Sequence, residues 1–233
     1  MRWEIYVLLF FIYSFLGWCL EMVCCNFGKD KIVNRGFLIG PICPIYGHGC
    51  LLMIFLLHKY LEDPIALFVM AVVLCSILEY VTSYLMEKIF KARWWDYSDK
   101  KYNLNGRICL LNSLAFGFLG LLIMYVVNPF LVSFLDRFSR TVLIVISSII
   151  FVIYLVDNIV SFSIISGFKK VCMSINKDNT EEITRRVRKI LSDKGLLYNR
   201  LVSAFDFKTS EMFLMFKEQF ESKMDKKNKK KGK

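Results

Sequence analysis

The sequence predicts an all-α fold: a polytopic helical membrane protein with about five transmembrane helices and a cytoplasmic amphipathic helical tail. Hydrophobic residues make up 56% of the 233 residues, and most of them gather in long continuous runs. A run of about 20 apolar residues spans a hydrocarbon core roughly 30 Å thick. The predicted membrane domain covers residues 1–168, and its spans are residues 5–25, 43–61, 64–87, 108–127 and 141–166.

The first two spans differ in regularity. The first follows one early arginine, is too long for a signal peptide and has no small-x-small cleavage site, so a retained helix is predicted. The second span begins within residues 36–49, a segment that contains four glycines and two prolines. Such a segment does not form a regular helix, and at membrane depth it requires a protein cover or a wet cavity. We predict a broken or re-entrant start to this helix; the alternative is an interfacial loop with a proline-capped helix start.

The remaining spans have recognisable ends. Pro64 suits the first turn of the third helix, and the fourth is predicted to end at Asn128-Pro129, with a short interfacial helix near residues 130–138. The fifth ends at Gly167. Beyond it, the capping-box spacing from Asp178 to Glu181 and the helical period of the apolar residues predict cytoplasmic amphipathic helices over residues 169–225. Residues 226–233 are predicted to be a disordered basic tail.

The net charge of +11 reflects membrane orientation in this interpretation, and no nucleic-acid partner is expected. Residues 26–42, 88–107 and 167–233 hold 27 of the 31 Lys and Arg residues. These three segments share one side of the membrane if the spans alternate. The excess of basic residues on the cytoplasmic side then places the N-terminus outside and the C-terminus in the cytoplasm. It also favours contact with anionic membrane lipids.

Acidic side chains inside apolar spans are the main functional signal. Glu21, Glu79 and Asp157 each interrupt a different span, and a charge there costs at least about 2.5–3.5 kcal/mol. All three lie in the predicted cytoplasmic halves of their helices, as do Tyr46 and Asn112. We therefore predict one polar cavity that opens inward and binds a substrate or a proton. The open alternative is a polar cluster that only fixes helix packing.

Basic and aromatic residues flank the predicted cavity. Arg35 and Arg107 lie at the inner mouths of the second and fourth helices, and we expect at least one of them to pair with Glu21 or Glu79. Trp95 and Asp96 belong to an aromatic stretch that is typical of a membrane interface. The same stretch is also compatible with a loop that folds over the cavity mouth.

The eight cysteines do not form a recognisable framework. No C-x-x-C pair occurs, and the cysteines lie in the spans or at their cytoplasmic ends, where thiols stay reduced. Buried apolar thiols are therefore expected, with no metal and no cofactor. The alternative is a metal site built from Cys24, Cys25, Cys43 and His48, although these residues lack the usual ligand spacing.

Several short motifs together resemble a known bacterial family. They are Asn34-Arg35-Gly36-Phe37 with Gly40-Pro41, Cys43-Pro44-Ile45-Tyr46-Gly47, Trp95-Asp96-Tyr97-Ser98 and Asn105-Gly106-Arg107-Ile108-Cys109-Leu110. In type and order they resemble the putative ABC-transporter permeases of the CmpB type, over roughly residues 1–170. The resemblance implies a multi-pass protein of the bacterial cell membrane with a transport role. It also implies that Arg35, Tyr46, Trp95, Asp96 and Arg107 are functional positions.

The function predicted from these observations is a permease-like component of an ABC-type transporter. The chain has no Gly-x4-Gly-Lys-Ser/Thr phosphate loop, so ATP hydrolysis would require a separate ATPase subunit. Because five helices are few for a transporter, a homo- or hetero-oligomer is expected. Two alternatives stay open: a non-catalytic membrane assembly or sensor protein, and an intramembrane enzyme acting on a lipid-linked substrate. A catalytic activity of the chain itself is the less favoured of these options.

Overall fold

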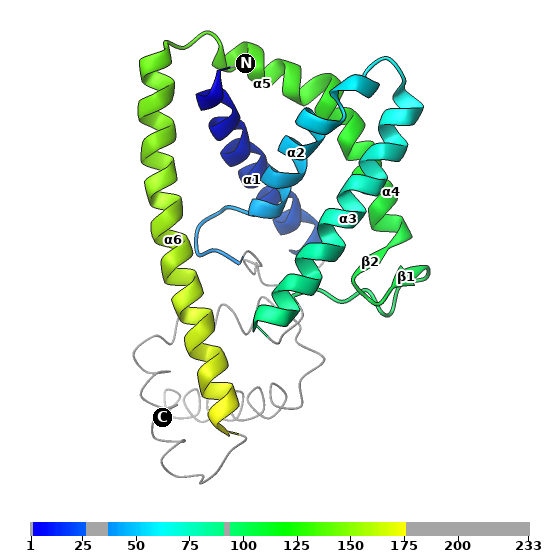
Figure 1. The fold of residues 1–233 in the computed structure, drawn as a ribbon, viewed down its shortest axis with the longest axis vertical. Coiled ribbons are helices and arrows are strands. Elements are labelled where there is room, and N and C mark those ends of the chain that lie inside the picture. The colour runs from blue at the N-terminus through cyan, green and yellow to red at the C-terminus, as the bar shows by residue number, and fades with distance from the viewer. Residues whose placement is uncertain (1, 27–36, 91–93, 176–233) are drawn as a thin grey trace, which may run out of the picture. The chain divides into compact units, whose positions relative to one another are not determined.

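The computed structural model describes residues 2–26, 37–90 and 94–175 (Figure 1). The chain divides into two compact units, of which the first comprises Met1–Leu85 and Asp96–Ser161, and the second Met86–Trp95 and Phe162–Lys233. The described part of the second unit consists of the last turn of α3, residues 94 and 95, and the end of α6. Arg35 and the predicted basic tail 226–233 lie outside the described residues. So does the predicted helical tail 169–225, except for residues 169–175, which continue α6.

The described chain is mostly helical and has one small hairpin, which confirms the predicted all-α membrane fold. Four helical stretches are long and apolar enough to cross a membrane: Trp3–Val23, Pro64–Ile89, Leu110–Leu135 and Arg140–Ser163. The elements in chain order are α1 (Trp3–Asn26), α2 (Pro44–Leu56), a 3₁₀ turn (His58–Tyr60), α3 (Pro64–Phe90), β1 (Asn103–Leu104), β2 (Ile108–Cys109), α4 (Leu110–Leu122), a π-helical turn (Ile123–Val127), α5 (Asn128–Leu135) and α6 (Arg140–Ile175).

The second predicted span, residues 43–61, contains a short helix. α2 has 13 residues, which at 1.5 Å per residue measure about 20 Å, less than the hydrocarbon thickness. Its first residue is a proline, and residues 37–43 before it are not helical. The irregular start expected from the glycines and prolines is therefore observed. Whether this segment re-enters the membrane remains a prediction.

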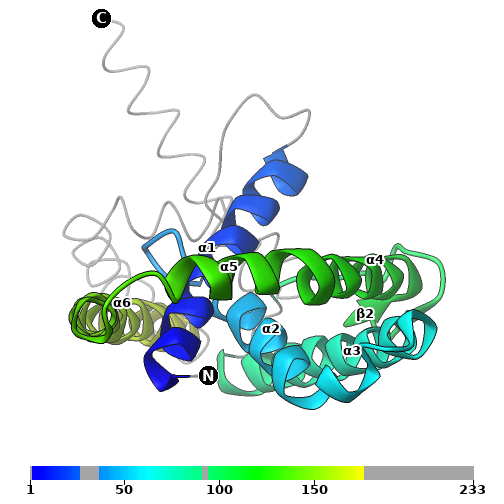
Figure 2. The same ribbon diagram turned by 90° about the horizontal axis from the view of Figure 1, so that it is seen from above.

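Pro129 does not end the fourth helix. The chain stays helical from α4 to Leu135, with a π-helical turn immediately before the proline-containing α5. Proline lacks a backbone N–H and its ring crowds the carbonyl one turn earlier, and a widened turn relieves this conflict. α5 then crosses one end of the first unit from α4 towards α6 (Figures 1 and 2). The sequence predicted a short helix close to this position, at residues 130–138.

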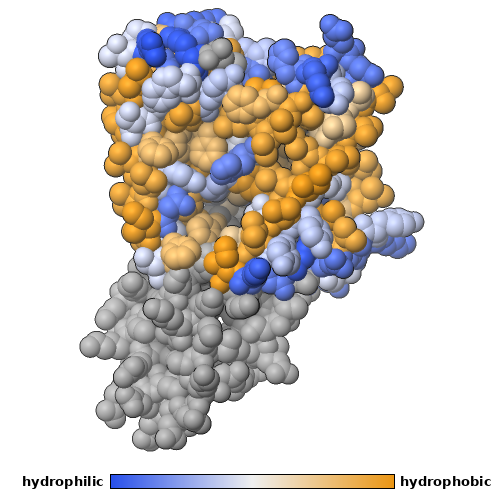
Figure 3. All heavy atoms as spheres, viewed as in Figure 1, coloured by the Kyte–Doolittle hydropathy of each residue, from blue (hydrophilic) through white to orange (hydrophobic). Residues whose placement is uncertain are grey.

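Small residues allow the helices of the first unit to approach closely. A Cβ added to Gly47 of α2 would lie 2.2 Å from Ser14 Oγ of α1, and one added to Gly120 of α4 would lie 2.8 Å from Ala71 Cβ of α3. Close approach at small residues is the usual way in which helices pack in lipid. On the face drawn in Figure 3, hydrophobic residues form a belt between hydrophilic ends, and a few hydrophilic residues interrupt it.

Candidate functional site

A tyrosine and a glutamate join α2 to α1. Tyr46, in the first turn of α2, donates a hydrogen bond from its hydroxyl to Glu21 Oε1 at 2.6 Å. The contact depends on Gly17, because a Cβ there would lie 2.2–2.6 Å from three atoms of Tyr46. Pro44 begins α2, and the residue before it, Cys43, donates its backbone N–H to the Ser14 carbonyl of α1 at 2.9 Å. The irregular segment and the glycine together place the Tyr46 hydroxyl beside Glu21.

A second tyrosine–glutamate pair joins α3 to the loop that follows it. Tyr97 donates its hydroxyl to Glu79 Oε1 at 3.0 Å. Glu79 is buried, with 6% of its surface exposed, and its Oε2 has no hydrogen-bond partner among the described residues. Asn112 of α4 forms a hydrogen bond with Tyr97. Helices α3 and α4 and the loop between them therefore meet at one hydroxyl group.

The electrostatics of Tyr97 connect the two pairs. Burial raises the pKa of Tyr97, and the negative charge of Glu79 raises it further. Glu21 also raises this pKa, whereas the hydrogen bond from Asn112 lowers it. Tyr97 consequently stays protonated and remains a donor at physiological pH. We call Glu21, Tyr46, Glu79, Tyr97 and Asn112 the tyrosine–glutamate cluster.

The hairpin β1–β2 fixes the position of Tyr97. Its strands pair in the register Asn103 with Cys109 and Leu104 with Ile108. The turn contains Asn105 and Gly106, both with positive φ, and the Gly106 carbonyl accepts the Tyr97 backbone N–H at 2.8 Å. Asp96, which precedes Tyr97, is exposed and accepts hydrogen bonds from the backbone and the hydroxyl of Ser98.

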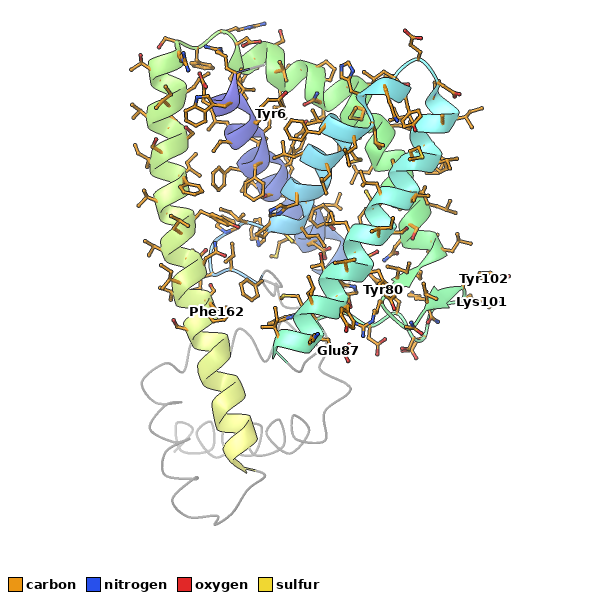
Figure 4. All side chains as sticks on the ribbon, viewed as in Figure 1. Tyr6, Tyr80, Glu87, Lys101, Tyr102 and Phe162 are labelled. Atoms are coloured by element: carbon orange, nitrogen blue, oxygen red, sulfur yellow. The ribbon has the colours of Figure 1, made fainter. Side chains whose placement is uncertain are left out.

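The exposed end of the hairpin carries other residues. Lys101 and Tyr102, which immediately precede β1, point away from the helices (Figure 4). Tyr102, like Asn105, has a positive φ, and 81% of its surface is exposed.

Arg107 attaches the hairpin to α3. It is 9% exposed, its guanidinium carbon lies 5.7 Å and 5.5 Å from the ring centroids of Tyr80 and Tyr84, and its Nη1 donates to Ser83 Oγ at 3.3 Å. Contacts of a cation with aromatic faces stabilise such a group away from water. Arg107 thus binds α3 about one turn beyond Glu79. Its expected ion pair with Glu21 or Glu79 stays a prediction.

Asp157 of α6 binds a different part of the fold. Its carboxylate accepts the backbone N–H groups of Ile39 and Gly40, at 3.0 Å and 2.8 Å, and the Ser161 hydroxyl at 2.9 Å. A Cβ added to Gly40 would lie 2.9 Å from Asp157 Oδ2. The described contacts therefore place Asp157 against the segment before α2, and place Glu21 and Glu79 in the tyrosine–glutamate cluster. A single cavity shared by all three acids remains a prediction.

Two further predicted site residues are not joined to this cluster by the described contacts. Arg35 lies outside the described residues, and Trp95, which is partly buried, belongs to the second unit. A loop that closes the cavity mouth through Trp95 and Asp96 stays a prediction. Among the described residues, no group of three or more His, Cys, Asp or Glu could hold a metal ion. The alternative set with Cys24 and Cys25 is not tested, since their side chains are not described.

Sequence analysis did not select two residues that the structure brings forward. Tyr97 lies inside the motif Trp95-Asp96-Tyr97-Ser98, but no role was predicted for it, although a tyrosine hydroxyl can donate a hydrogen bond to an acid in a membrane helix. Glu4 is completely buried, and its Oε1 lies 3.0 Å from Arg140 Nε of α6. Nearby, Arg2 pairs with Asp136 at 2.9 Å. Glu4 could have been found from its position at the start of the first apolar run.

One of the three comparisons with known proteins found a match. A family model described as putative ABC-transporter type IV matches residues 8–162, well over half of the chain. No curated protein and no solved structure matches the chain. The matched range includes most of α1, all of α2 to α5, most of α6 and the whole tyrosine–glutamate cluster. The chain is therefore a membrane protein with a transport-related role, and it belongs to the putative ABC-transporter type IV family.

Proposed function

We propose that this protein is the membrane-spanning permease component of a transporter and that its tyrosine–glutamate cluster lines the path of a polar solute. The observation that carries the proposal is the pair of hydroxyl-bound acids, Tyr46 with Glu21 and Tyr97 with Glu79, within apolar spanning helices. Ionisable groups at membrane depth are costly and typically mark substrate or ion pathways.

The short helix α2 supports the same proposal. Non-helical backbone within a membrane is tolerated only against protein or beside a water-filled cavity. Residues 37–43 are not helical, and they lead directly into the turn that carries Tyr46. Interrupted helices of this kind often form binding sites in transporters. Asp157 holds this segment through Ile39 and Gly40 and so helps to position the solute path.

The orientation and the partners are part of the proposal. With the N-terminus outside a bacterial cell membrane and the C-terminus inside, the basic hairpin and the tail face the cytoplasm and its anionic lipids. The cluster then opens inward, as predicted. A separate ATPase subunit supplies the energy, and a second copy or another membrane subunit completes the path.

The solute pathway can be tested before the solute is identified. Cells that produce the wild-type protein, Glu79→Gln or the control Glu62→Gln are compared by untargeted mass spectrometry of solutes inside the cells and in the medium. Glu62 is exposed in the turn before α3, so its replacement should have no effect. We expect at least one polar solute to be redistributed by the wild type and the control and several-fold less by Glu79→Gln. Identical profiles in all strains would reject the permease proposal.

The orientation is tested separately with reporter fusions. A cytoplasmic fluorescent reporter inserted after Lys101 should be active, whereas a periplasmic phosphatase inserted after Glu62 should be active on the opposite side. The reverse pattern would place the cluster near the outer surface and contradict an inward-opening path.

The ATPase partner is tested by isolating the protein from native membranes, which should also recover a subunit that hydrolyses ATP. Redistribution of the solute without ATP would argue against an ABC-type component.

A further inference from the structure

The two oxygens of Glu79 have different surroundings. Oε1 accepts the Tyr97 hydroxyl, whereas Oε2 is buried and has no hydrogen-bond partner among the described residues. No ion pair of Glu79 occurs within that part of the chain, and its side chain is almost completely removed from solvent. A buried carboxylate in this state costs several kcal/mol unless something compensates its charge.

The groups that face Glu79 do not supply that compensation. They are Glu21 from α1, Tyr97 from the loop and Cys75 from α3 itself, and each is either acidic or neutral. Asn112 of α4 and Tyr46 of α2 reach Tyr97 and are also neutral. Arg107 is a cation that contacts α3 about one turn beyond Glu79. Its guanidinium group contacts Ser83 and the rings of Tyr80 and Tyr84.

A buried carboxyl group that faces no cation ionises only at a high cost, and a bound proton removes this cost because it makes the group neutral. A proton also needs no cavity of its own. Oε2 of Glu79, which has no hydrogen-bond partner among the described residues, is the oxygen open to it.

We propose that Glu79 binds one exchangeable proton at Oε2 and that each transport cycle includes the uptake and release of this proton. The proposal rests on the proposed function and adds a proton-binding site to the same cluster, while the separate ATPase subunit still supplies the energy. In the step, a proton from water binds the carboxylate of Glu79 and gives a neutral carboxylic acid. Release returns the proton to water and restores the carboxylate, with no other bond formed or broken.

The surroundings of Glu79 favour both states and so make the proton exchangeable. Burial and the charge of Glu21 favour the protonated acid, whereas a hydrogen bond donated to a carboxylate favours the ionised form. Tyr97 donates such a bond. Tyr97 is therefore a positioning residue that weakens proton binding and keeps release possible.

The test is an infrared titration of the purified full-length protein, with the proton itself as the probe. A protonated carboxylic acid has a carbonyl stretch that the carboxylate lacks, so difference spectra across pH report its titration. We expect a band from one buried carboxyl group to titrate in the wild type and in the control Glu62→Gln. The band should be absent in Glu79→Gln. A band that persists unchanged in Glu79→Gln, or no titrating band in the wild type, would overturn the proposal.

Tyr97→Phe provides a second criterion, which also holds if Glu79→Gln does not fold. Loss of the donated hydrogen bond should move the midpoint upward by about one pH unit, a tenfold gain in proton affinity. Tyr102→Phe is the matched control, because this tyrosine immediately before β1 is 81% exposed. An unchanged midpoint in Tyr97→Phe would contradict the proposal. The titration needs no solute, so it can fail while the solute comparison succeeds, and the two results are independent.

Discussion

The two ends of α1 carry buried acids in contrasting surroundings. Glu4 is completely buried near the start of the helix. Its Oε1 lies 3.0 Å from Arg140 Nε, close enough for an ion pair, although neither of its oxygens has a hydrogen-bond partner among the described residues. The second pair, Arg2 and Asp136, lies beside it. Glu21 lies seventeen residues later, about 25 Å along the helix axis, and is bound by the Tyr46 hydroxyl. At the first end, two acids face two cations. At the second end, the Tyr46 hydroxyl donates a hydrogen bond to Glu21, and the Tyr97 hydroxyl donates one to Glu79.

This difference separates a structural role from a functional one. A buried acid that pairs with an arginine holds helices together, because removing either partner leaves the charge of the other without compensation. Acids held by neutral donors can gain or lose a proton or bind a solute group without breaking the fold. The contacts at the Glu4 end therefore stabilise the packing of α1 against α5 and α6, whereas the tyrosine–glutamate cluster has the properties of a functional site.

The largest effect is expected at the charge-balanced end. Arg140→Met should leave Glu4 buried without its cation and lower the free energy of unfolding by about 3 kcal/mol, the low end of the range for breaking a buried pair, because 63% of the Arg140 side chain is exposed. Detergent titration of the purified protein measures this. Arg137→Met, an exposed arginine three residues earlier, is the control and should change stability little. Equal effects of the two variants would mean that Glu4 does not depend on Arg140.

A second large effect is expected where α1 and α2 cross. In Gly17→Ala the new Cβ would overlap the Cβ and ring of Tyr46, so the helices must shift, at a cost of about 2 kcal/mol. The same shift would separate Tyr46 from Glu21. Gly49→Ala is the control, because its nearest neighbour, Leu78 Cδ2, lies 3.3 Å away and can give way. Thermal unfolding compares the two, and a Gly17→Ala protein as stable as Gly49→Ala would contradict the close crossing.

The sequence predicted the helical elements better than their contacts. Apolar run length identified the four long helices, because the bilayer alone sets that length. It overestimated α2 and stopped the fourth helix at Pro129, since hydropathy carries no information about helix breaks or about a π-helical turn that accommodates proline. The acids Glu21 and Glu79 were found from their cost in an apolar run. Glu4 was missed because it stands at a predicted boundary, where an acid is ordinarily solvated.

Asp157 illustrates the limit of predicting a site from depth alone. It was grouped with Glu21 and Glu79 because all three occupy the same half of their helices. Its described partners, however, are the backbone N–H groups of Ile39 and Gly40 and the Ser161 hydroxyl. These contacts depend on the path of residues 37–43, and local sequence patterns do not determine that path.

An intermediate effect is therefore expected for Asp157→Asn. The amide has a single acceptor oxygen, so one of the two backbone N–H groups of Ile39 and Gly40 would lose its partner, at a cost of about 1.5 kcal/mol. Ser161→Ala removes only the hydroxyl donor and should cost less. Limited proteolysis within residues 37–43, together with the unfolding free energy, measures both variants. Equal protection of this segment in the wild type and in Asp157→Asn would show that the carboxylate does not hold it.

The smallest effect on stability, and the one of opposite sign, is expected at Glu79. Glu79→Gln keeps an acceptor for Tyr97 and removes an acid that faces another acid, so the free energy of unfolding should stay unchanged or rise by up to about 1 kcal/mol. Glu4→Gln is the matched variant and should be destabilising, because it removes the negative partner of Arg140. Detergent titration of both proteins at neutral pH makes the comparison. If Glu79→Gln were destabilised and Glu4→Gln were stable, Glu79 would have the structural role and Glu4 would not. The expected pattern, a stable protein that has lost its solute redistribution, would separate the role of Glu79 in transport from any role in folding.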